Sequence, residues 1–223
     1  MKPLNNICIR WLQGCLIFFV AGCSSQVKQK IVSPVDIEKS AFVHRAFNQI
    51  GEAKNLIKNG DIITRLGNDF TSQSLKKLNR RDETWSHCGI ASFENDTLFV
   101  YHSLGGEWNP DEKIKRDLFE AFSEPFSNNG IGIYRFDISE SVVKKIPLTA
   151  STFKNAGVSF DMDFNLQSDD KMYCAEFVCK VIEKASGKSL EFNHSFINKF
   201  EFIGVDDIFL HPQCRHVKTY LYK

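Results

Sequence analysis

A cysteine at the start of a predicted helix is the residue in this sequence best suited to covalent chemistry. Cys174 follows a polar, aspartate-rich loop and lies in the first turn of a segment, 173–185, whose apolar residues recur on one helical face. A helix N-terminus carries partial positive charge and unpaired N–H groups, which favour a thiolate and offer an oxyanion donor. Cys174 is therefore a candidate nucleophile, and Tyr173 beside it a candidate substrate-binding residue. The alternative is a small buried hydrophobe, the commonest role of a cysteine.

Two histidines on neighbouring predicted strands are candidates to activate this thiol. His87 begins a strand next to a small residue, Gly89, and a base for a thiol must itself be held in place. His102 ends the return strand, and a turn near Asn95 would bring positions 87 and 102 close together across the hairpin. We therefore expect His87 to be the base and His102 to orient it. The alternatives are a structural histidine and a surface residue at a strand end.

Other cysteine, histidine and aspartate residues carry weaker signals. We interpret three further cysteines as core residues or as a stray pair. The chain has no C-x-x-C motif, so we expect no zinc site. Two aspartates precede apolar runs, where capping is the favoured interpretation and a position flanking the site the alternative. The remaining histidines lie in the first helix, in loops or in the tail. These residues are Cys88, Cys179 and Cys214; Asp61 and Asp161; and His44, His194, His211 and His216.

The elements that must position these side chains follow a mixed pattern. Helices are expected at 34–59, 109–122, 139–156 with a break at Pro147, and 173–185, and a short turn at 205–210. Strands are expected at 61–65, 86–93, 97–102, 131–136 and 217–222. Helices, then a meander, then helices predict an α+β fold with a small, mostly antiparallel sheet packed by helices.

The composition suits one globular domain with an exported N-terminus. The chain has 223 residues, 43% hydrophobic and 25% charged, and its formal charge of +1 gives no electrostatic case for nucleic acid. Residues 1–22 carry a basic start and a short apolar run typical of a secretory signal. Cys23 follows Val20-Ala21-Gly22. We expect a signal at 1–22, a polar tether at 23–33 and one domain at 34–223, with an ordinary cleaved signal or an N-terminal anchor as the alternative.

Several short motifs, taken in order, resemble one enzyme family. They are Gly60-Asp61-Ile62-Ile63, Ser86-His87-Cys88-Gly89-Ile90, Val100-Tyr101-His102, Tyr134-Arg135-Phe136, Phe160-Asp161-Met162-Asp163-Phe164 and Tyr173-Cys174-Ala175-Glu176-Phe177-Val178, with a shorter echo at Val205-Asp206-Asp207-Ile208. With the histidine before the cysteine, the chain resembles the circularly permuted papain-like (YiiX/YaeF-like) hydrolases, relatives of the NlpC cell-wall peptidases. The stretch before Cys23 likewise resembles a bacterial lipobox.

The resemblance implies a permuted papain-like fold, with Cys174 as nucleophile, His87 as base and His102 at a position that the family often fills with Glu. It implies an envelope cysteine hydrolase that acts on an amide of a cell-wall peptide through a thioester, without metal or organic cofactor. Two alternatives are an acyltransferase or lipid hydrolase, as in lecithin:retinol acyltransferase relatives, and a non-catalytic binding lipoprotein. Lipidation of Cys23 would anchor the chain to a membrane, by resemblance the periplasmic side of the outer membrane.

Overall fold

The computed structural model describes residues 34–106 and 109–223. Residues 34–223 make up one compact unit. The predicted signal, the candidate lipidation residue Cys23 and the tether lie outside the described residues. Among the helices of the described part, none is long and apolar enough to cross a bilayer.

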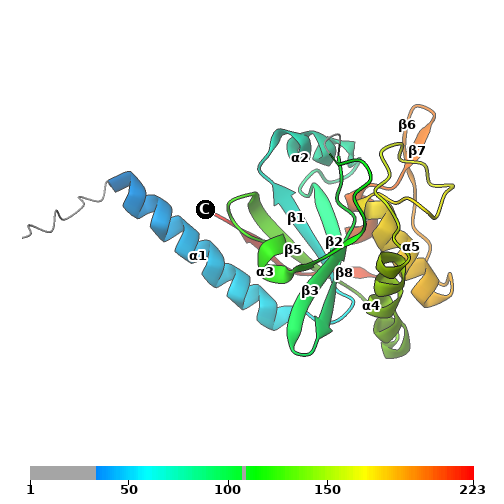
Figure 1. The fold of residues 1–223 in the computed structure, drawn as a ribbon, viewed down its shortest axis with the longest axis horizontal. Coiled ribbons are helices and arrows are strands. Elements are labelled where there is room, and N and C mark those ends of the chain that lie inside the picture. The colour runs from blue at the N-terminus through cyan, green and yellow to red at the C-terminus, as the bar shows by residue number, and fades with distance from the viewer. Residues whose placement is uncertain (1–33, 107–108) are drawn as a thin grey trace, which may run out of the picture. The chain divides into compact units, whose positions relative to one another are not determined.

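A six-stranded sheet forms the centre of the unit (Figure 1). Its strand order is β4-β3-β2-β1-β5-β8, and each pair of neighbours is antiparallel. A separate two-stranded hairpin, β6–β7, lies near the C-terminus of the chain. The predicted α+β class with a mostly antiparallel sheet is confirmed. The strands are β1 (Ile62–Gly67), β2 (His87–Glu94), β3 (Thr97–His102), β4 (Lys115–Leu118), β5 (Asn128–Phe136), β6 (Ser195–Ile197), β7 (Phe200–Phe202) and β8 (Cys214–Leu221).

Helices pack on both faces of the sheet because successive strand residues point to opposite sides. On one face, α4 (Glu140–Asn155) and α5 (Cys174–Ser186) pack on a core that includes Ile62, Cys88 and Ile90. On the other, α1 (Pro34–Leu56) and α3 (Phe119–Phe122) cover a core that includes Ile63 and Ala91. Shorter helical segments are α2 (Phe70–Leu75), the 3₁₀ turn η1 (Lys76–Leu78) and α6 (Val205–Phe209).

The segment 109–122 departs from the sequence-based prediction of a helix. Only residues 119–122 are helical, and residues 115–118 form the edge strand β4, paired with β3 through Val100↔Asp117 and His102↔Lys115. The Asn-Pro-Asp at 109–111 resembles a helix start, but the hydrogen bonds that β3 offers are non-local and outweigh that local signal. The prediction of one long helix is therefore wrong here.

Helix α4 also differs from expectation, because it runs through Pro147 without a break. Proline removes one backbone hydrogen bond. Ile146 and Ala150 on either side of it are fully buried, so packing against the sheet holds the helix together across that position.

Candidate functional site

Cys174 occupies the first position of α5, as its sequence context predicts. Glu176 accepts a hydrogen bond from the Tyr173 N–H at 3.3 Å, which fixes the start of the helix. Burial raises the pKa of Glu176 to about 7, and Lys180 pairs with its carboxylate at 3.0 Å. The helix packs through Ala175 and Phe177 into the core. The nucleophile candidate thus stands at a rigid helix start beside the central sheet.

Cys88 is a buried member of the core against which Cys174 packs. A side-chain hydrogen bond with Cys88 lowers the pKa of the Cys174 thiol below its ordinary value, and the backbone N–H groups of Cys88 and Ala175 and the charge of Arg65 act in the same direction, while burial opposes them. Burial and the same contact raise the pKa of Cys88 well above its ordinary value. The two opposite shifts favour the negative charge on Cys174 and the proton on Cys88. Cys179, deeper in the helix, is fully buried, and burial also raises its pKa.

His87 and His102 form the first two members of a hydrogen-bonded relay that ends at Asp117. Nε2 of His87 lies 2.9 Å from Nδ1 of His102, and Nε2 of His102 lies 3.0 Å from Oδ2 of Asp117. An ionised carboxylate only accepts, so His102 donates from Nε2 and accepts at Nδ1. His87 then donates from Nε2, which leaves its Nδ1 lone pair free. The relay thereby selects the tautomer of His87 that a base requires.

The hairpin between β2 and β3 brings the two histidines together on one side of the sheet. The register pairs Ile90 with Tyr101, so His102 stands diagonally across from His87 rather than directly opposite. Gly89 makes room for it, because a Cβ at that position would lie 3.0 Å from the His102 Cβ and 2.7 Å from the Tyr101 carbonyl oxygen. The expected closeness of positions 87 and 102 is thus present, with a diagonal geometry.

The electrostatic environment keeps the histidines neutral. Burial lowers the pKa of His87 well below its ordinary value, and the positive charge of Arg65 and the neighbouring His102 lower it further. Arg65 is the register partner of His87 on β1, and its guanidinium donates to the Phe122 carbonyl at 2.9 Å. Burial also lowers the pKa of His102, although its bond to Asp117 opposes the shift. His87 is therefore an unprotonated imidazole near neutral pH.

Cys174 and His87 line the same pocket, whose empty space, including the part open to solvent, is about 510 Å³. Its walls come from α2, η1, the loop that follows β3, the segment around 160–164, the start of α5 and the end of β7. No charged side chain contributes to the lining. The apolar lining residues are Leu75, Leu78, Leu104, Phe160, Phe164, Ala175, Phe202, Ile203 and Val205.

Tyr173 and Phe164 form one wall of this pocket. The ring centroids of Phe164 and Tyr173 lie 4.7 Å apart, and the Tyr173 hydroxyl accepts a hydrogen bond from the Ile203 N–H at 2.7 Å. Phe164 has a left-handed backbone, φ 53°, which costs energy for a non-glycine residue. The buried carboxylate of Asp161 holds it by accepting from the N–H groups of Asp163 and Asn165. Asp161 thus caps the loop that presents Phe164 to the pocket.

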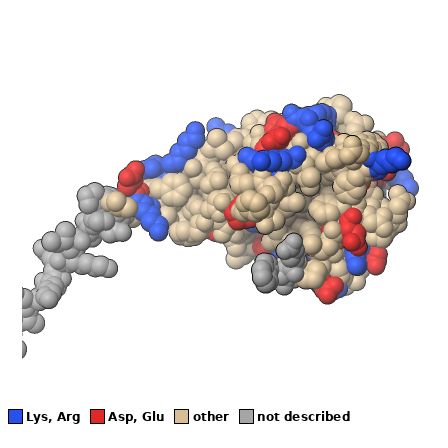
Figure 2. Space-filling model, turned by 90° about the horizontal axis from the view of Figure 1, so that it is seen from above, with Lys and Arg blue, Asp and Glu red and all other residues tan. Residues whose placement is uncertain are grey.

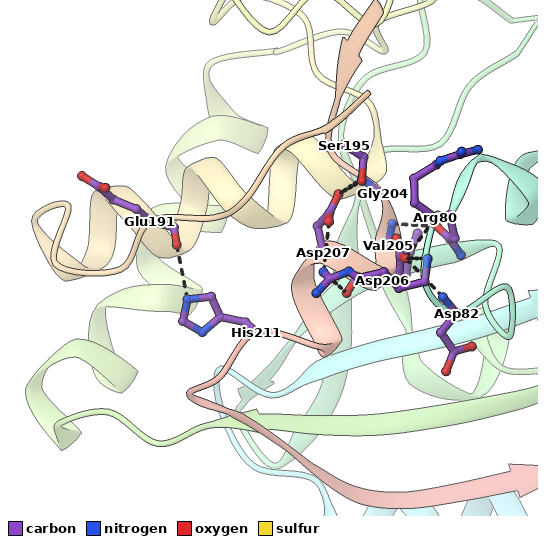
Figure 3. A network of polar contacts seen from close by, with 11 residues as sticks. Arg80, Asp82, Glu191, Ser195, Gly204, Val205, Asp206, Asp207 and His211 are labelled. Atoms are coloured by element: carbon purple, nitrogen blue, oxygen red, sulfur yellow. Dashed lines mark hydrogen bonds and ion pairs between the residues drawn. The ribbon is translucent and has the colours of Figure 1, made fainter. Parts of the chain in front are cut away.

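A polar network beside α6 fixes the chain that leads into β2 (Figure 3). Oδ2 of Asp206 accepts from the backbone N–H groups of Arg80 at 3.0 Å, Arg81 at 2.7 Å and Asp82 at 3.3 Å. Asp207 accepts from the Ser195 hydroxyl and the Gly204 N–H, at 2.8 and 2.7 Å. Both aspartates are almost fully buried. The network ties the segment before His87 to the element that forms the other side of the pocket.

The other residues considered from the sequence lie outside this pocket. Asp61 pairs with Arg135 through two contacts of 2.6 Å and does not flank the site. His211 approaches the Glu191 carbonyl (Figure 3), and His216 the Thr219 hydroxyl. His44 and His194 bond to Asn48 and Glu201, and Cys214 lies at the start of β8. Across residues 34–106 and 109–223, no group of three or more His, Cys, Asp or Glu side chains could hold a metal ion.

Sequence reasoning missed Asp117 and Arg65. Asp117 fell in a segment predicted as helix, where its position gave no sign of a strand beside His102. Arg65 was only the last residue of the strand predicted at 61–65, and we predicted no role for it from the sequence. The sequence Ile114-Lys115-Arg116-Asp117-Leu118 has no period-two alternation of apolar and polar residues, so no local signal indicated β4.

Comparison with known proteins gives a match in structure only. No family model matches the sequence, and no curated protein matches it. Among solved structures, the chain is similar to the metalloprotein YiiX from Escherichia coli O157:H7 (DUF1105), with a TM-score of 0.61 and 19% sequence identity. The match covers 74% of this chain and 99% of YiiX. The chain therefore shares the fold of YiiX.

Proposed function

We propose that this protein is a cysteine-dependent acyl hydrolase or acyltransferase, with Cys174 as nucleophile and His87 as base. One observation carries the proposal: the two residues line one apolar pocket, and His87 is held there by His102 and Asp117. A base oriented by a second group is what an activated nucleophile requires. The His-before-Cys order and the likeness to YiiX support a circularly permuted papain-like fold.

The chemistry would proceed through a thioester. Nδ1 of His87 takes the proton of the Cys174 thiol, and the sulfur attacks the carbonyl carbon of the substrate. The N–H of Cys174, at the start of α5, donates to the oxygen that becomes negative. The tetrahedral adduct collapses as the bond to the leaving group breaks, and His87 returns the proton to that group. Water or another acceptor then attacks the thioester carbonyl carbon and gives its proton to His87. The carbon–sulfur bond breaks, the free acid or the acylated acceptor leaves, and His87 returns the proton to the Cys174 sulfur.

The lining of the pocket favours an apolar acyl group over a cell-wall peptide. A ligand pocket usually has charged or polar side chains opposite the charged or polar groups of its ligand, because an unpaired buried charge is costly. Cell-wall peptides carry several carboxylates, whereas the lining offers no cation and nine apolar side chains. We therefore place the acyl-lipid or thioester substrate, initially the alternative, ahead of the cell-wall amide. Tyr173 would contribute its ring to the wall that contacts the acyl chain.

The N-terminal sequence supports a membrane location for this activity. The signal-like residues 1–22 and the lipobox-like cysteine at position 23 are consistent with a lipoprotein of the bacterial envelope, which would hold the pocket near lipid substrates. Metabolic labelling with a fatty-acid analogue, with Cys23→Ala as control, tests the anchor separately from the enzymatic activity.

A mass-spectrometric assay tests the proposed activity. Purified protein is incubated with short-chain acyl thioesters, phospholipids and muropeptides in parallel, and we expect release of free acid from the acyl substrates alone. Cys174→Ala should abolish turnover, while Cys179→Ala, a buried cysteine of the same helix, should retain it. Turnover of muropeptides alone would support the amidase. Labelling of Cys174 by iodoacetamide no faster than Cys179, together with no turnover of any substrate, would support a non-catalytic binding protein.

A further inference from the structure

The hairpin β6–β7, whose Phe202 lines the pocket, exposes one aromatic ring on each of its two faces: Phe200 on the same face as Phe202, and Phe196 on the opposite face, paired with Glu201. Phe196 is 56% exposed and Phe200 is 42% exposed, and Lys199 stands at the turn between their strands. The hairpin is no part of the six-stranded sheet and has only three residues in each strand. We refer to Phe196, Lys199 and Phe200 as the hairpin rim. Exposed apolar rings are costly in water, and contiguous exposed apolar surface often marks an interaction site.

Apolar surface continues from the hairpin rim to the nucleophile. The ring of Phe200 lies 5.7 Å from that of Phe202 and 6.5 Å from that of Phe164, both of which line the pocket. Phe164 in turn contacts Tyr173, the neighbour of Cys174. A chain of aromatic rings thus leads from solvent to the reactive sulfur.

The opposite margin of the pocket has the same chemistry. Leu75 of α2 lines the pocket and is 36% exposed, and Lys76 and Lys77 follow it in η1. Figure 2 views the molecule from the side on which Figure 1 draws α2 and the hairpin, and most of that face carries neither basic nor acidic side chains. Glu201, the carboxylate of the hairpin, bonds to His194 at 2.7 Å. Cations and apolar side chains therefore border the pocket on two sides.

We propose that the hairpin rim docks on a bilayer interface, with the rings of Phe196 and Phe200 among the acyl chains and Lys199 at anionic headgroups. Aromatic rings favour this interfacial depth, and each lysine near an anionic surface adds to the attraction. In this position an acyl chain passes from the bilayer along Phe200 and Phe164 into the pocket. The purpose of the docking rests on the proposed function, but the docking needs no active nucleophile.

The test measures depth rather than binding, so that any N-terminal anchor in the full-length chain does not interfere. Phe196→Trp is compared with Phe126→Trp, a similarly exposed ring, 62%, which packs against Phe47 of α1. With vesicles of phosphatidylcholine and phosphatidylglycerol that carry brominated acyl chains, we expect the Phe196→Trp fluorescence to shift to the blue and to be quenched at least twofold relative to Phe126→Trp. We expect the same difference between the two probes in a Cys174→Ala background. The docking could therefore be established even if the protein lacked the proposed enzymatic activity. Equal fluorescence for the two probes would overturn the proposal.

Two further arms separate the bilayer from other sources of the signal. A soluble short-chain acyl thioester, kept below its micelle concentration, should leave the Phe196→Trp emission unchanged, and an equal response would overturn docking in favour of simple pocket occupancy. Lys199→Glu should reduce quenching on vesicles with phosphatidylglycerol more than on pure phosphatidylcholine. Phe196→Ser should lower kcat/KM for a vesicle-borne substrate by about tenfold, which corresponds to the loss of one aromatic side chain buried in the bilayer. It should leave kcat/KM for the soluble substrate unchanged. Equal losses on both substrates would contradict the proposal.

Discussion

Nδ1 of His102 lies 2.9 Å from Nε2 of His87, and this contact decides which nitrogen of His87 carries a proton. Because Asp117 accepts from the far side of His102, both imidazoles are fixed in one tautomer. Nδ1 is then the nitrogen of His87 that can take up a proton, and His87 is one of the residues that line the pocket. Each step of the proposed chemistry depends on this arrangement.

Removal of His102 should therefore impair the chemistry without removing the nucleophile. We expect His102→Ala to lower kcat/KM by about 100-fold, because His87 loses the partner that fixes its tautomer. Asp117→Asn, at the half-exposed end of the relay, should have a smaller effect of about tenfold. Steady-state kinetics on a soluble acyl substrate measures both. Full activity in His102→Ala would contradict a positioning role.

The Cys88 side chain should tune the reactivity of Cys174. Cys88→Ala removes the thiol that lowers the pKa of Cys174, so the pH midpoint for iodoacetamide labelling of Cys174 should rise. Cys179→Ala creates a similar cavity in the same core and is the matched control, because it leaves that hydrogen bond in place. The labelling rate as a function of pH, read by mass spectrometry, checks the shift. An equal midpoint in both variants would show that the Cys88 contact is without effect.

The buried His87 should make the fold less stable in acid. Its pKa in the folded state lies well below 6.5, whereas in the unfolded chain it titrates near 6.5. As the pH falls below that value, the unfolded chain takes up a proton that the folded chain does not, so stability is lost. His87→Gln should remove this contribution, and its Tm should fall less than that of the wild type between about pH 7.5 and pH 5. Calorimetry at both pH values measures the difference, and parallel curves would refute the prediction.

Gly89 should tolerate no side chain. A Cβ there would lie 2.6 Å from Cγ1 of Val100 and 2.7 Å from the Tyr101 oxygen, so Gly89→Ala should destabilise the fold by about 1–3 kcal/mol and displace His102. Gly51→Ala in α1, where no atom lies within 4 Å, should instead stabilise it by about 0.5–1 kcal/mol. Urea unfolding of the two variants provides the comparison. Similar changes in both would mean that the close approach at Gly89 carries no cost.

The Asp206 carboxylate should be important for stability rather than chemistry. It accepts from three backbone N–H groups and is fully buried, so Asp206→Ala should cost roughly 2–4 kcal/mol in unfolding free energy. Asp170→Ala, at an exposed loop position, should change it by less than about 0.5 kcal/mol. Chemical denaturation measures both, and a near-neutral Asp206→Ala would show that the network of Figure 3 is dispensable.

The sequence predicts most of the fold because its strong signals are local. The strand at 97–102 agrees with β3, and Gly187, in the left-handed conformation, ends α5 where the sequence expects an end. The prediction of a helix at 109–122 was wrong because β4 forms by pairing with β3. The hairpin β6–β7 was not predicted. Both depend on partners that no periodicity reveals.

The candidate site was predictable in its main members but not in its surroundings. Cys174 and His87 have local contexts, a helix start and a strand start, that are visible along the chain. Asp117 and Arg65 act through neighbours set by strand register, and Cys88 through contact with a helix that begins 86 residues later. Strand register and helix packing arise only in the folded chain. Their effect on the pKa values of Cys174 and His87 could therefore not be predicted from the sequence.

Asp117 gives the relay one end that meets water. His102 is fully buried, while the Asp117 side chain is 43% exposed and stands on the edge strand of the sheet. Dissolved ions reach that carboxylate and screen it, whereas the two imidazoles are shielded from them. The protonation pattern of the two buried histidines therefore depends on a carboxylate at the protein surface. A molecule that covers or neutralises Asp117 would also change the basicity of His87.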